Sequence, residues 1–240
     1  MELIRVEHLR KHFRGVAAVA DVSLAVSEHE ALGIIGPNGA GKTTVFNLIA
    51  GAIRPDSGRV ILAGRDITRL GGHRRLRRGL ARTFQLVHPF PSLTVRENLI
   101  VSATGSGMSL RAARLRADKL LATFTMTGMA ARPAGTLNAA EGRRLEIARA
   151  AAARPQVILL DEIFTGLSTG EVADLATLVT DLRRGGMTIL IIEHNVTAIR
   201  TVADRVVAMQ AGRVICEGDP AAVFSDPRVV ESYLGHRASA

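Results

Sequence analysis

The 240-residue chain contains no tryptophan, one tyrosine and one cysteine. The lone cysteine, Cys216, cannot form a disulfide within the chain, so we expect a fold that does not depend on oxidation and a reducing compartment. No stretch approaches the roughly 18–20 consecutive apolar residues of a membrane-spanning helix, and residues 1–5 do not resemble a secretory signal. The shortage of aromatic rings, with Tyr233 standing apart, removes the stacking surfaces on which single-stranded nucleic acid binds.

Lysine is also scarce, so arginine carries nearly all of the formal net charge of +9. Basic residues gather at 73–78 and, on an expected helix, at Arg111, Arg114 and Arg116. A solvated surface is the simplest interpretation of these runs, and anionic lipid headgroups or an acidic protein partner are the alternatives. Nucleic acid is not expected as a partner, because no aromatic residues are interleaved with the arginines.

Apolar residues make up 47% of the chain, which is enough for one well-buried domain. Continuous apolar runs at 157–160 and 188–192 are typical of strands covered on both faces. A helix is expected between them at 171–184. Further strands are predicted at 4–9, 22–26, 31–35, 59–63, 206–209 and 214–216, and a further helix at 43–50.

The pattern changes between about 89 and 153, where it becomes helical and rich in alanine and arginine. We therefore expect a single domain over 1–240, with an α/β core formed by 1–88 and 154–240 and a helical subdomain at 89–153.

A glycine-rich loop lies between the expected strand at 31–35 and the expected helix at 43–50. It fits the pattern G-x-x-x-x-G-K-[ST] of a phosphate-binding P-loop without mismatch. The glycines let backbone N–H groups point at phosphate oxygens, the lysine adds a positive charge, and the threonine hydroxyl suits Mg²⁺. The predicted nucleotide-binding residues are Gly36, Pro37, Asn38, Gly39, Ala40, Gly41, Lys42, Thr43 and Thr44.

The apolar run at 157–160 ends in two carboxylates, Asp161 and Glu162. The carboxyl ends of strands in open α/β sheets are where ligands bind. Asp161 is expected to hold Mg²⁺, and Glu162 is placed to act as a general base toward the water that attacks the γ-phosphate. An acidic pair that only caps the next helix is the alternative.

Two further polar residues end apolar stretches. His194 follows the run at 188–192 and can donate a hydrogen bond to a γ-phosphate. Gln85 has an amide oxygen suited to Mg²⁺ or to positioning water. Either residue alone would be unremarkable, and it is their order along the chain that carries information.

That order resembles the ABC ATPase family over essentially the whole chain. The resemblance implies a RecA-like mixed-sheet core, an N-terminal antiparallel β-subdomain and a helical signature subdomain. It identifies 36–44 as the Walker A motif, Gln85 as the Q-loop, 157–162 as Walker B and His194 as the switch histidine. It also places Phe13 where the adenine ring stacks.

Several segments are similar to the ATP-binding subunit of branched-chain amino acid importers, a group with relatives that handle urea and amides. The resemblance implies ATP and Mg²⁺, transmembrane permease subunits, a second ATP-binding subunit and, indirectly, a substrate-binding protein. It also implies a peripheral position on the cytoplasmic face of the cell membrane. The segments are 81–85, 93–99, 143–150, 192–195 and 230–235.

The chain departs from the family at the signature loop, usually Leu-Ser-Gly-Gly-Gln, which reaches the partner's nucleotide across a dimer. Asn138 remains a good helix N-cap. Alanines replace the glycines, and Glu141 is expected to bring a carboxylate near phosphate. We expect a mixed dimer with one strong and one weak site, ordinary subfamily drift being the alternative. The substituted loop is Leu137, Asn138, Ala139, Ala140 and Glu141.

Smaller departures follow Walker B, where Ile163 and Phe164 replace a proline and a small residue, and where Ser168 stands in the D-loop. A permease is expected in the groove beside Gln85, including Leu86, Val87 and Phe90, together with the helical stretch at 89–153. Two other functions are weighed: a soluble ABC ATPase acting on nucleic acid or ribosomes, and a subunit that binds ATP but hydrolyses it weakly.

Overall fold

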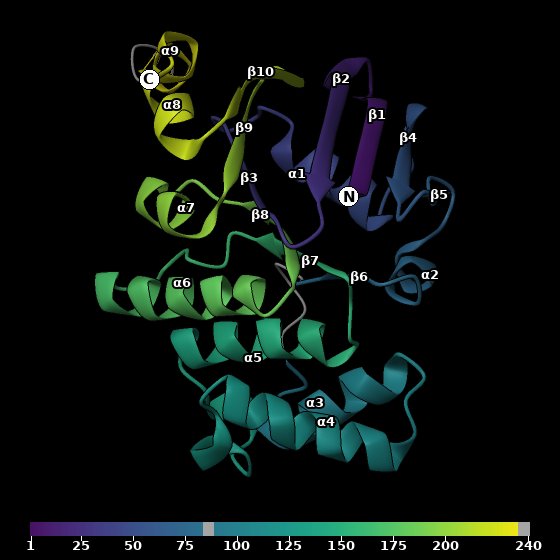
Figure 1. Ribbon diagram of the computed structural model, residues 1–240, viewed down its shortest axis with the longest axis vertical. Helices are drawn as coiled ribbons and strands as arrows, with labels where there is room; N and C mark the ends of the chain where they lie inside the picture. Colours follow the sequence, from purple (N-terminus) through teal and green to yellow (C-terminus); the bar gives the residue numbers. More distant parts are fainter. Residues whose placement is uncertain (84–88, 235–240) are drawn as a thin grey trace.

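The computed structural model describes residues 1–83 and 89–234. In this part of the chain ten strands form one mixed sheet in the order β5-β4-β1-β2-β10-β9-β3-β8-β7-β6 (Figure 1). The sheet has an antiparallel part at one side and a mainly parallel part at the other. This confirms the mixed α/β fold predicted from the sequence.

The antiparallel part is a long hairpin with two added strands. Strands β1 (Glu2–Phe13) and β2 (Val16–Ser27) pair through a tight turn in which Arg14 and Gly15 have positive φ. Strand β4 (Ser57–Leu62) pairs with β1, and β5 (Arg65–Asp66) pairs with β4. Alternating burial along β1 and β2 leaves one face of the hairpin on the core.

The parallel part carries the strands whose ends form the site. β3 (Ala31–Ile35), β7 (Val157–Asp161) and β8 (Thr188–Ile192) are buried along their whole length, as their apolar runs predicted. β8 pairs in parallel with both β3 and β7, and β6 (Leu80–Arg82) pairs with β7. The hairpin of β9 (Arg205–Gln210) and β10 (Arg213–Gly218) confirms the one predicted near the C-terminus.

Helices cover both faces of this sheet, and the buried apolar residues form two clusters, one on each side. Helix α1 follows the P-loop. The helices of this part are α1 (Lys42–Ala50), α2 (Gly72–Leu76), α6 (Thr169–Arg184), α7 (Val196–Val202), α8 (Pro220–Ser225) and α9 (Pro227–Leu234).

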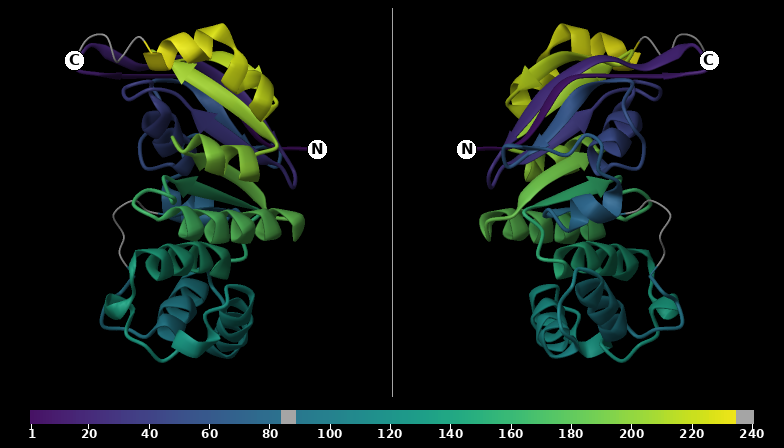
Figure 2. Two further views of the ribbon diagram at one scale, coloured as in Figure 1. Left: turned by 90° about the vertical axis from the view of Figure 1, so that its left-hand side faces the viewer. Right: turned by 90° about the vertical axis from the view of Figure 1, so that its right-hand side faces the viewer.

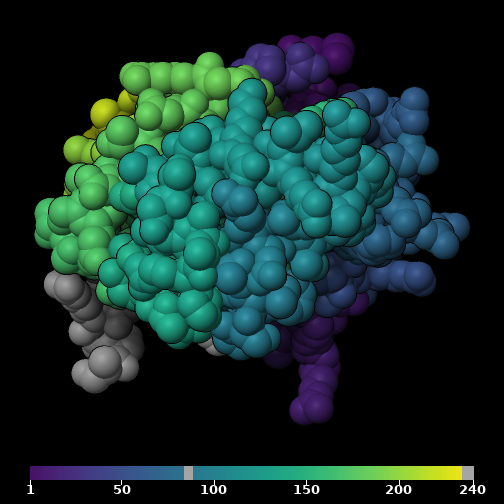
Figure 3. Space-filling model, turned by 90° about the horizontal axis from the view of Figure 1, so that it is seen from below, coloured from purple at the N-terminus to yellow at the C-terminus, as the bar shows by residue number. Residues whose placement is uncertain are grey.

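A separate helical layer lies at the end away from β1 and β2 (Figure 2). It contains α3 (Val95–Gly105), α4 (Leu110–Thr123) and α5 (Ala139–Ala152), with 3-10 turns at Thr127–Met129 and Ala134–Thr136. Seen from below, residues of this layer cover most of that end of the molecule (Figure 3). The helical stretch expected from the sequence is thus found as helices.

No helix in the described part of the chain combines the length and apolar character needed to cross a lipid bilayer.

Candidate functional site

The P-loop joins the buried strand β3 to helix α1 and wraps around its own lysine. The Lys42 ammonium donates hydrogen bonds to the carbonyl oxygens of Gly36, at 2.6 Å, and Pro37, at 3.0 Å. Gly41 is the N-cap of α1, and no side chain caps the helix there. The N-cap glycine offers no side-chain acceptor to the positive N-terminal end of α1, which suits an anion-binding loop.

Two glycines of the loop are fixed by close backbone contacts. A Cβ on Gly36 would lie 2.2 Å from the carbonyl oxygen of Met209, and one on Gly41 would lie 2.3 Å from that of Ala18. Both have positive φ, as does Gly39, which has open space around it. The first and last glycines of the motif thus let the loop press against β9 and β2.

Asp161 ends β7 and is buried, with 2% of its surface exposed. Its Oδ2 accepts a hydrogen bond from Arg82 at 2.9 Å. Arg82 also donates to the side-chain oxygen of Asn47 on α1 and lies over the ring of Phe46. Oδ1 of Asp161 is buried without a hydrogen-bond partner among the described residues. One carboxylate oxygen is therefore held by Arg82, and the other is buried with no hydrogen bond from the described residues, an environment that could suit a cation.

The structure brings the acidic strand end and the P-loop lysine together. Ile192 of β8 is in register with Ile34 of β3 and with Asp161 of β7, so the three strands end at the same edge. Glu162 follows Asp161 with φ +47, and its N–H donates to the carbonyl oxygen of Ile192 at 3.0 Å. Burial lowers the pKa of the Lys42 ammonium, and the negative charge of Glu162 opposes this shift. The negative charge of Glu162 thus acts on the P-loop lysine.

His194 lies at the same edge and is exposed, just past the end of β8. Its neighbour Glu193 is buried, and its carboxylate accepts hydrogen bonds from the N–H groups of Phe164, at 2.9 Å, and His194, at 3.3 Å. Burial raises the pKa of Glu193. Glu193 thereby ties the segment after β8 to the loop after β7, a link that the sequence analysis missed.

Phe13 lies at the tip of the β1–β2 hairpin and is 46% exposed. The same hairpin carries Ala18, whose carbonyl oxygen touches the P-loop at Gly41. The Lys11 ammonium lies 5.6 Å from the centre of the Phe13 ring. An exposed ring near the loop suits the predicted adenine contact, which stays a prediction. Gln85, Leu86 and Val87 lie outside the described residues.

The carboxylate in the signature loop has partners that the sequence did not reveal. Asn138 caps α5, and the Glu141 carboxylate turns back to accept a hydrogen bond from the Asn138 N–H at 3.0 Å. The Arg132 guanidinium donates hydrogen bonds to both oxygens of this carboxylate, at 2.9 and 3.2 Å. The pKa of Glu141 is lowered by Arg132 and by the Asn138 N–H. The carboxylate is therefore paired within its own chain, and its expected position near the partner's phosphate stays a prediction. Leu137 lies at the edge of the core, while Ala139 is exposed and Ala140 partly exposed.

Ser168 of the D-loop also has a local role. It caps α6 in a reciprocal pair with Glu171, where the Ser168 hydroxyl donates to the carboxylate at 2.7 Å. Ile163 and Phe164 are buried in the core. These departures from the family pattern thus supply packing and a helix cap.

Arg75 is the exception to the solvated surface expected for the run at 73–78, whose other basic residues are exposed. It is fully buried, and its guanidinium donates to the carbonyl oxygens of Leu48 and Ile49 at the C-terminal end of α1, both at 2.6 Å. It also donates to the carbonyls of Thr68 and Leu70. Burial lowers the pKa of Arg75 to about 10. The C-terminal end of the P-loop helix is therefore held by a cation, which is the favourable sign there.

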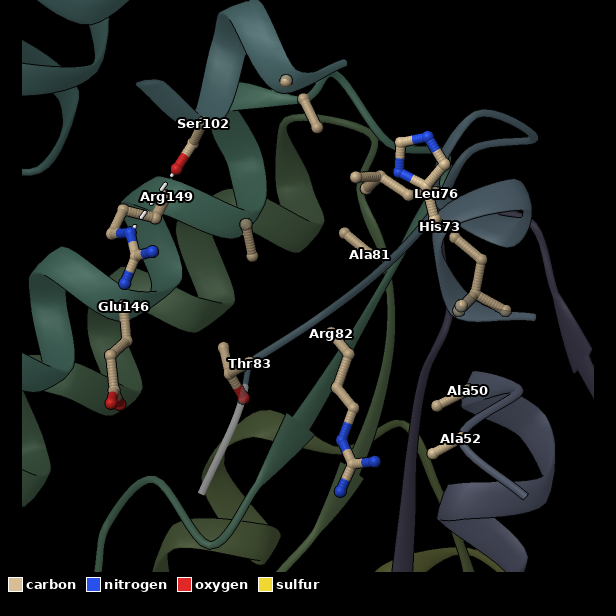
Figure 4. A pocket seen from close by; sticks show the side chains of 15 residues that line it. Ala50, Ala52, His73, Leu76, Ala81, Arg82, Thr83, Ser102, Glu146 and Arg149 are labelled. Atoms are coloured by element: carbon tan, nitrogen blue, oxygen red, sulfur yellow. Dashed lines mark hydrogen bonds between the residues drawn. The ribbon is translucent and has the colours of Figure 1, made fainter. Parts of the chain in front are cut away.

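A cavity of about 520 Å³ lies between the core and the helical layer. Figure 4 shows Arg149, Ser102 and Glu146 on one side and His73 and Leu76 on the other, with Arg149 donating to the Ser102 hydroxyl. Arg149 also lies 5.3 Å from the ring centre of Phe90, which is 44% exposed. Whether this cavity is the groove predicted beside Gln85 is not tested, because residues 84–88 lie outside the described part of the chain.

A parallel sheet with a P-loop after β3 and an acidic pair at the end of β7 defines a P-loop nucleoside triphosphatase. The chain belongs to the ABC transporter family, because the sequence model of that family matches residues 19–165. A second model, described as branched-chain amino acid ATP-binding cassette transporter, matches residues 213–239.

Curated relatives match almost the whole chain. The lipopolysaccharide export system ATP-binding protein LptB of Haemophilus influenzae is 39% identical over 99% of this chain and 99% of its own. The high-affinity branched-chain amino acid transport ATP-binding protein BraF of Pseudomonas aeruginosa is 37% identical over 97% of this chain and 98% of its own.

Solved structures give the same result. A nucleotide-free ATP-binding cassette from an ABC transporter is 33% identical with a TM-score of 0.89, covering 97% of this chain and 99% of that one. The ADP conformation of an ATP-binding cassette of an ABC transporter has the same identity and TM-score, covering 98% and 99%. The chain is therefore the ATP-binding subunit of an ABC transporter, an ATPase coupled to transport.

Proposed function

We propose that this subunit powers an importer for branched-chain or related amino acids. The observation that carries the proposal is the match of residues 213–239 to the branched-chain amino acid model. The 37% identity to BraF over nearly the whole chain supports it.

Export of lipopolysaccharide is the second candidate, favoured by the 39% identity to LptB. The two differ in the permease that the subunit binds. Affinity purification of the chain from membranes, with identification of the attached subunits, separates them. A permease with a periplasmic-type amino acid binding protein supports the proposal, and a lipopolysaccharide permease contradicts it. ATPase activity stimulated by loaded binding protein is the second readout.

In the hydrolysis that we propose, each group at the sheet edge has one task. The Lys42 ammonium leaves the carbonyl oxygens of Gly36 and Pro37 and neutralises the β- and γ-phosphates. Glu162 accepts a proton from the attacking water, and His194 donates a hydrogen bond to the γ-phosphate. The exposed ring of Phe13 stacks on adenine. The charge of Glu162 acts on the Lys42 ammonium, which supports placing both groups at one phosphate site.

The residues at the strand end also fit Mg²⁺. The buried Asp161 Oδ1 lacks a hydrogen-bond partner among the described residues, and oxygen ligands are those that Mg²⁺ prefers. Asp161 and the Thr43 hydroxyl would hold the ion, together with Gln85, whose position is not described. When bound, Mg²⁺ neutralises phosphate charge. Arg82, which donates to Oδ2, would leave Oδ1 of Asp161 for the ion.

We propose that the permease docks into the groove between the core and the helical layer. The groove has apolar walls, with alanines from α1 and α5 and Leu76 from α2, and it has charged groups at Arg149 and Glu146. The exposed Phe90 ring extends this surface beyond the cavity. A short helical segment of a membrane subunit suits such a mixed groove. Phe90→Ala is expected to reduce recovery of the permease on copurification while ATP binding is kept.

Basic side chains on α2 and α4 suggest that the groove opens toward the membrane. His73 and Gly105, from α2 and the end of α3, line the groove, and α4 begins five residues after Gly105.

The basic side chains near the groove are mostly exposed. They are Arg74, Arg77 and Arg78, and also Arg111 and Arg114, which lie beside the exposed Leu110 and Leu115. Arg116 is not part of this proposed lipid-binding surface, because its guanidinium donates a hydrogen bond to the Ala151 carbonyl oxygen. Arginines with exposed leucines suit anionic lipid headgroups.

Vesicle binding tests this membrane proposal. The variant Arg111→Glu with Arg114→Glu is expected to lose binding to phosphatidylglycerol vesicles, and neutral phosphatidylcholine vesicles should bind neither protein. The matched control is Arg184→Glu with Arg213→Glu, which changes the net charge equally at two other exposed positions. Equal loss in both variants would show that only net charge matters. The proposed location is then the cytoplasmic face of the cell membrane.

A further inference from the structure

The only tyrosine of the chain contacts the P-loop across 197 residues of sequence. The Tyr233 hydroxyl accepts a hydrogen bond from the Gly36 N–H at 2.8 Å. The side chain is partly buried against the core, and burial raises the pKa of the phenol. The C-terminal helix α9 thereby reaches the first residue of the phosphate-binding loop.

Gly36 is held at three points by three parts of the fold. Its N–H is bound by Tyr233, its carbonyl oxygen accepts from the Lys42 ammonium at 2.6 Å, and its Cα lies against the Met209 carbonyl of β9. A change in the position of Lys42 thus acts on the same residue that Tyr233 holds. This chain of contacts links the group expected to bind phosphate with α9.

Helix α9 is itself well anchored. Val229 is 2% exposed, and the buried Ser232 donates its hydroxyl hydrogen bond to the Val229 carbonyl at 2.7 Å. The helix packs on α8 and β10. Because α9 packs on these two elements, Tyr233 can hold the P-loop in one position and does not simply move with it.

We propose that Tyr233 is a positioning residue for nucleotide binding, through which α9 fixes the start of the P-loop and responds when nucleotide binds. It does not touch the reacting atoms. Without the hydroxyl, the Gly36 N–H loses its acceptor and the loop start has more conformations, so part of the binding free energy is used to order it. The inference goes beyond the transport proposal, since it needs only nucleotide binding.

The first test is Tyr233→Phe, which removes one oxygen and keeps the ring. The Kd for Mg·ADP, measured by calorimetry on the purified chain, is expected to rise about five-fold, the effect of one neutral hydrogen bond. KM for ATP should rise by a similar factor. The value of kcat should stay near that of the wild type, because Tyr233 does not touch the attacking water or the other reacting atoms. Glu231→Gln, an exposed change on the same helix, is the control and should leave Kd unchanged. Equal Kd values for Tyr233→Phe and wild type would overturn the proposal.

The second test uses the wild-type chain and does not depend on how the variant folds. Because there is one tyrosine, labelling with [13Cζ]tyrosine gives one reporter carbon, attached to the hydroxyl that Gly36 binds. Its chemical shift is expected to change when Mg·ADP is added. An unchanged shift at saturating Mg·ADP would overturn the proposal and leave the transport function untouched. Failure of the chain to bind any permease would contradict the transport function alone.

Discussion

Asp161 and Glu162 are neighbours in sequence but have different surroundings. Asp161 is buried and accepts a hydrogen bond from Arg82, whereas Glu162 is partly exposed and has a φ of +47°. A left-handed backbone at a residue other than glycine costs about 1–2 kcal/mol, and such positions cluster at functional sites. The two adjacent carboxylates therefore differ in burial and in backbone conformation, which suits the separate roles proposed for them as ion ligand and general base.

Glu162→Gln tests the role of general base. We expect kcat for ATP hydrolysis to fall by at least about 100-fold, because the amide cannot accept the proton, while ATP binding is kept. Turnover assays and ATP binding measurements on the same preparation check both statements. The matched control is Glu28→Gln, an exposed position outside the site. An active Glu162→Gln enzyme would rule out the proposed base.

Glu193 makes a prediction about pH. Its pKa is raised by burial, so the folded state keeps this proton at pH values where the unfolded state has lost it. The contribution of Glu193 to the free energy of unfolding therefore falls as the pH rises above the ordinary glutamate pKa of about 4.5. Glu193→Gln cannot ionise, so its stability relative to wild type should increase from about pH 5 to about pH 8. Urea unfolding at both pH values measures this, and a pH-independent difference would contradict it.

The sequence predicted the residues that belong to local motifs, and it missed those that act over distance. Lys42 and Asp161 were predicted because the chemistry of phosphate and Mg²⁺ demands their types at fixed spacing. Arg82, Glu193 and Tyr233 were not assigned roles, because their partners lie on other elements and become neighbours only in the folded sheet.

At the scale of elements, the strands whose burial is complete were predicted best. The bounds of β3 and β8 agree with their apolar runs, because two covered faces demand apolar side chains at every position. The interpretation of the basic run at 73–78 as a solvated surface was wrong for Arg75 alone, because arginine is normally exposed and only the folded structure shows that Arg75 caps α1. The partner of Glu141 in the signature loop, Arg132, was equally hidden.

Helix α2 offers a matched pair of substitutions. Arg75→Met removes the donor from the carbonyl oxygens of Leu48 and Ile49, and we expect the free energy of unfolding to drop by about 3 kcal/mol. Arg74→Met removes the same charge from an exposed position of the same helix and should change it by less than about 0.5 kcal/mol. Urea unfolding measures both. Equal stabilities would mean that α1 does not depend on this cap.

At the scale of the whole molecule, the altered signature loop bears on how two ATP-binding subunits work together. ABC ATPases dimerise, and the resemblance described above implies that each signature loop reaches the partner's nucleotide. Here Asn138 and Glu141 satisfy each other, and Arg132 neutralises the carboxylate. The electrostatic penalty expected from the sequence is thus reduced. The alanine side chains at 139 and 140 still oppose the close approach that glycine permits.

This arrangement predicts unequal sites in a dimer with a different ATP-binding subunit. Glu162→Gln in this chain should remove nearly all ATPase activity of the reconstituted transporter, because its own Walker motifs face an intact signature. The equivalent change in the second subunit should remove less than about half, because that site faces the altered loop. Changing Ala139 and Ala140 to glycine should move the two losses toward equality, since it removes the Cβ atoms that hold the weak site apart. Equal losses before that change would show that both sites already work alike.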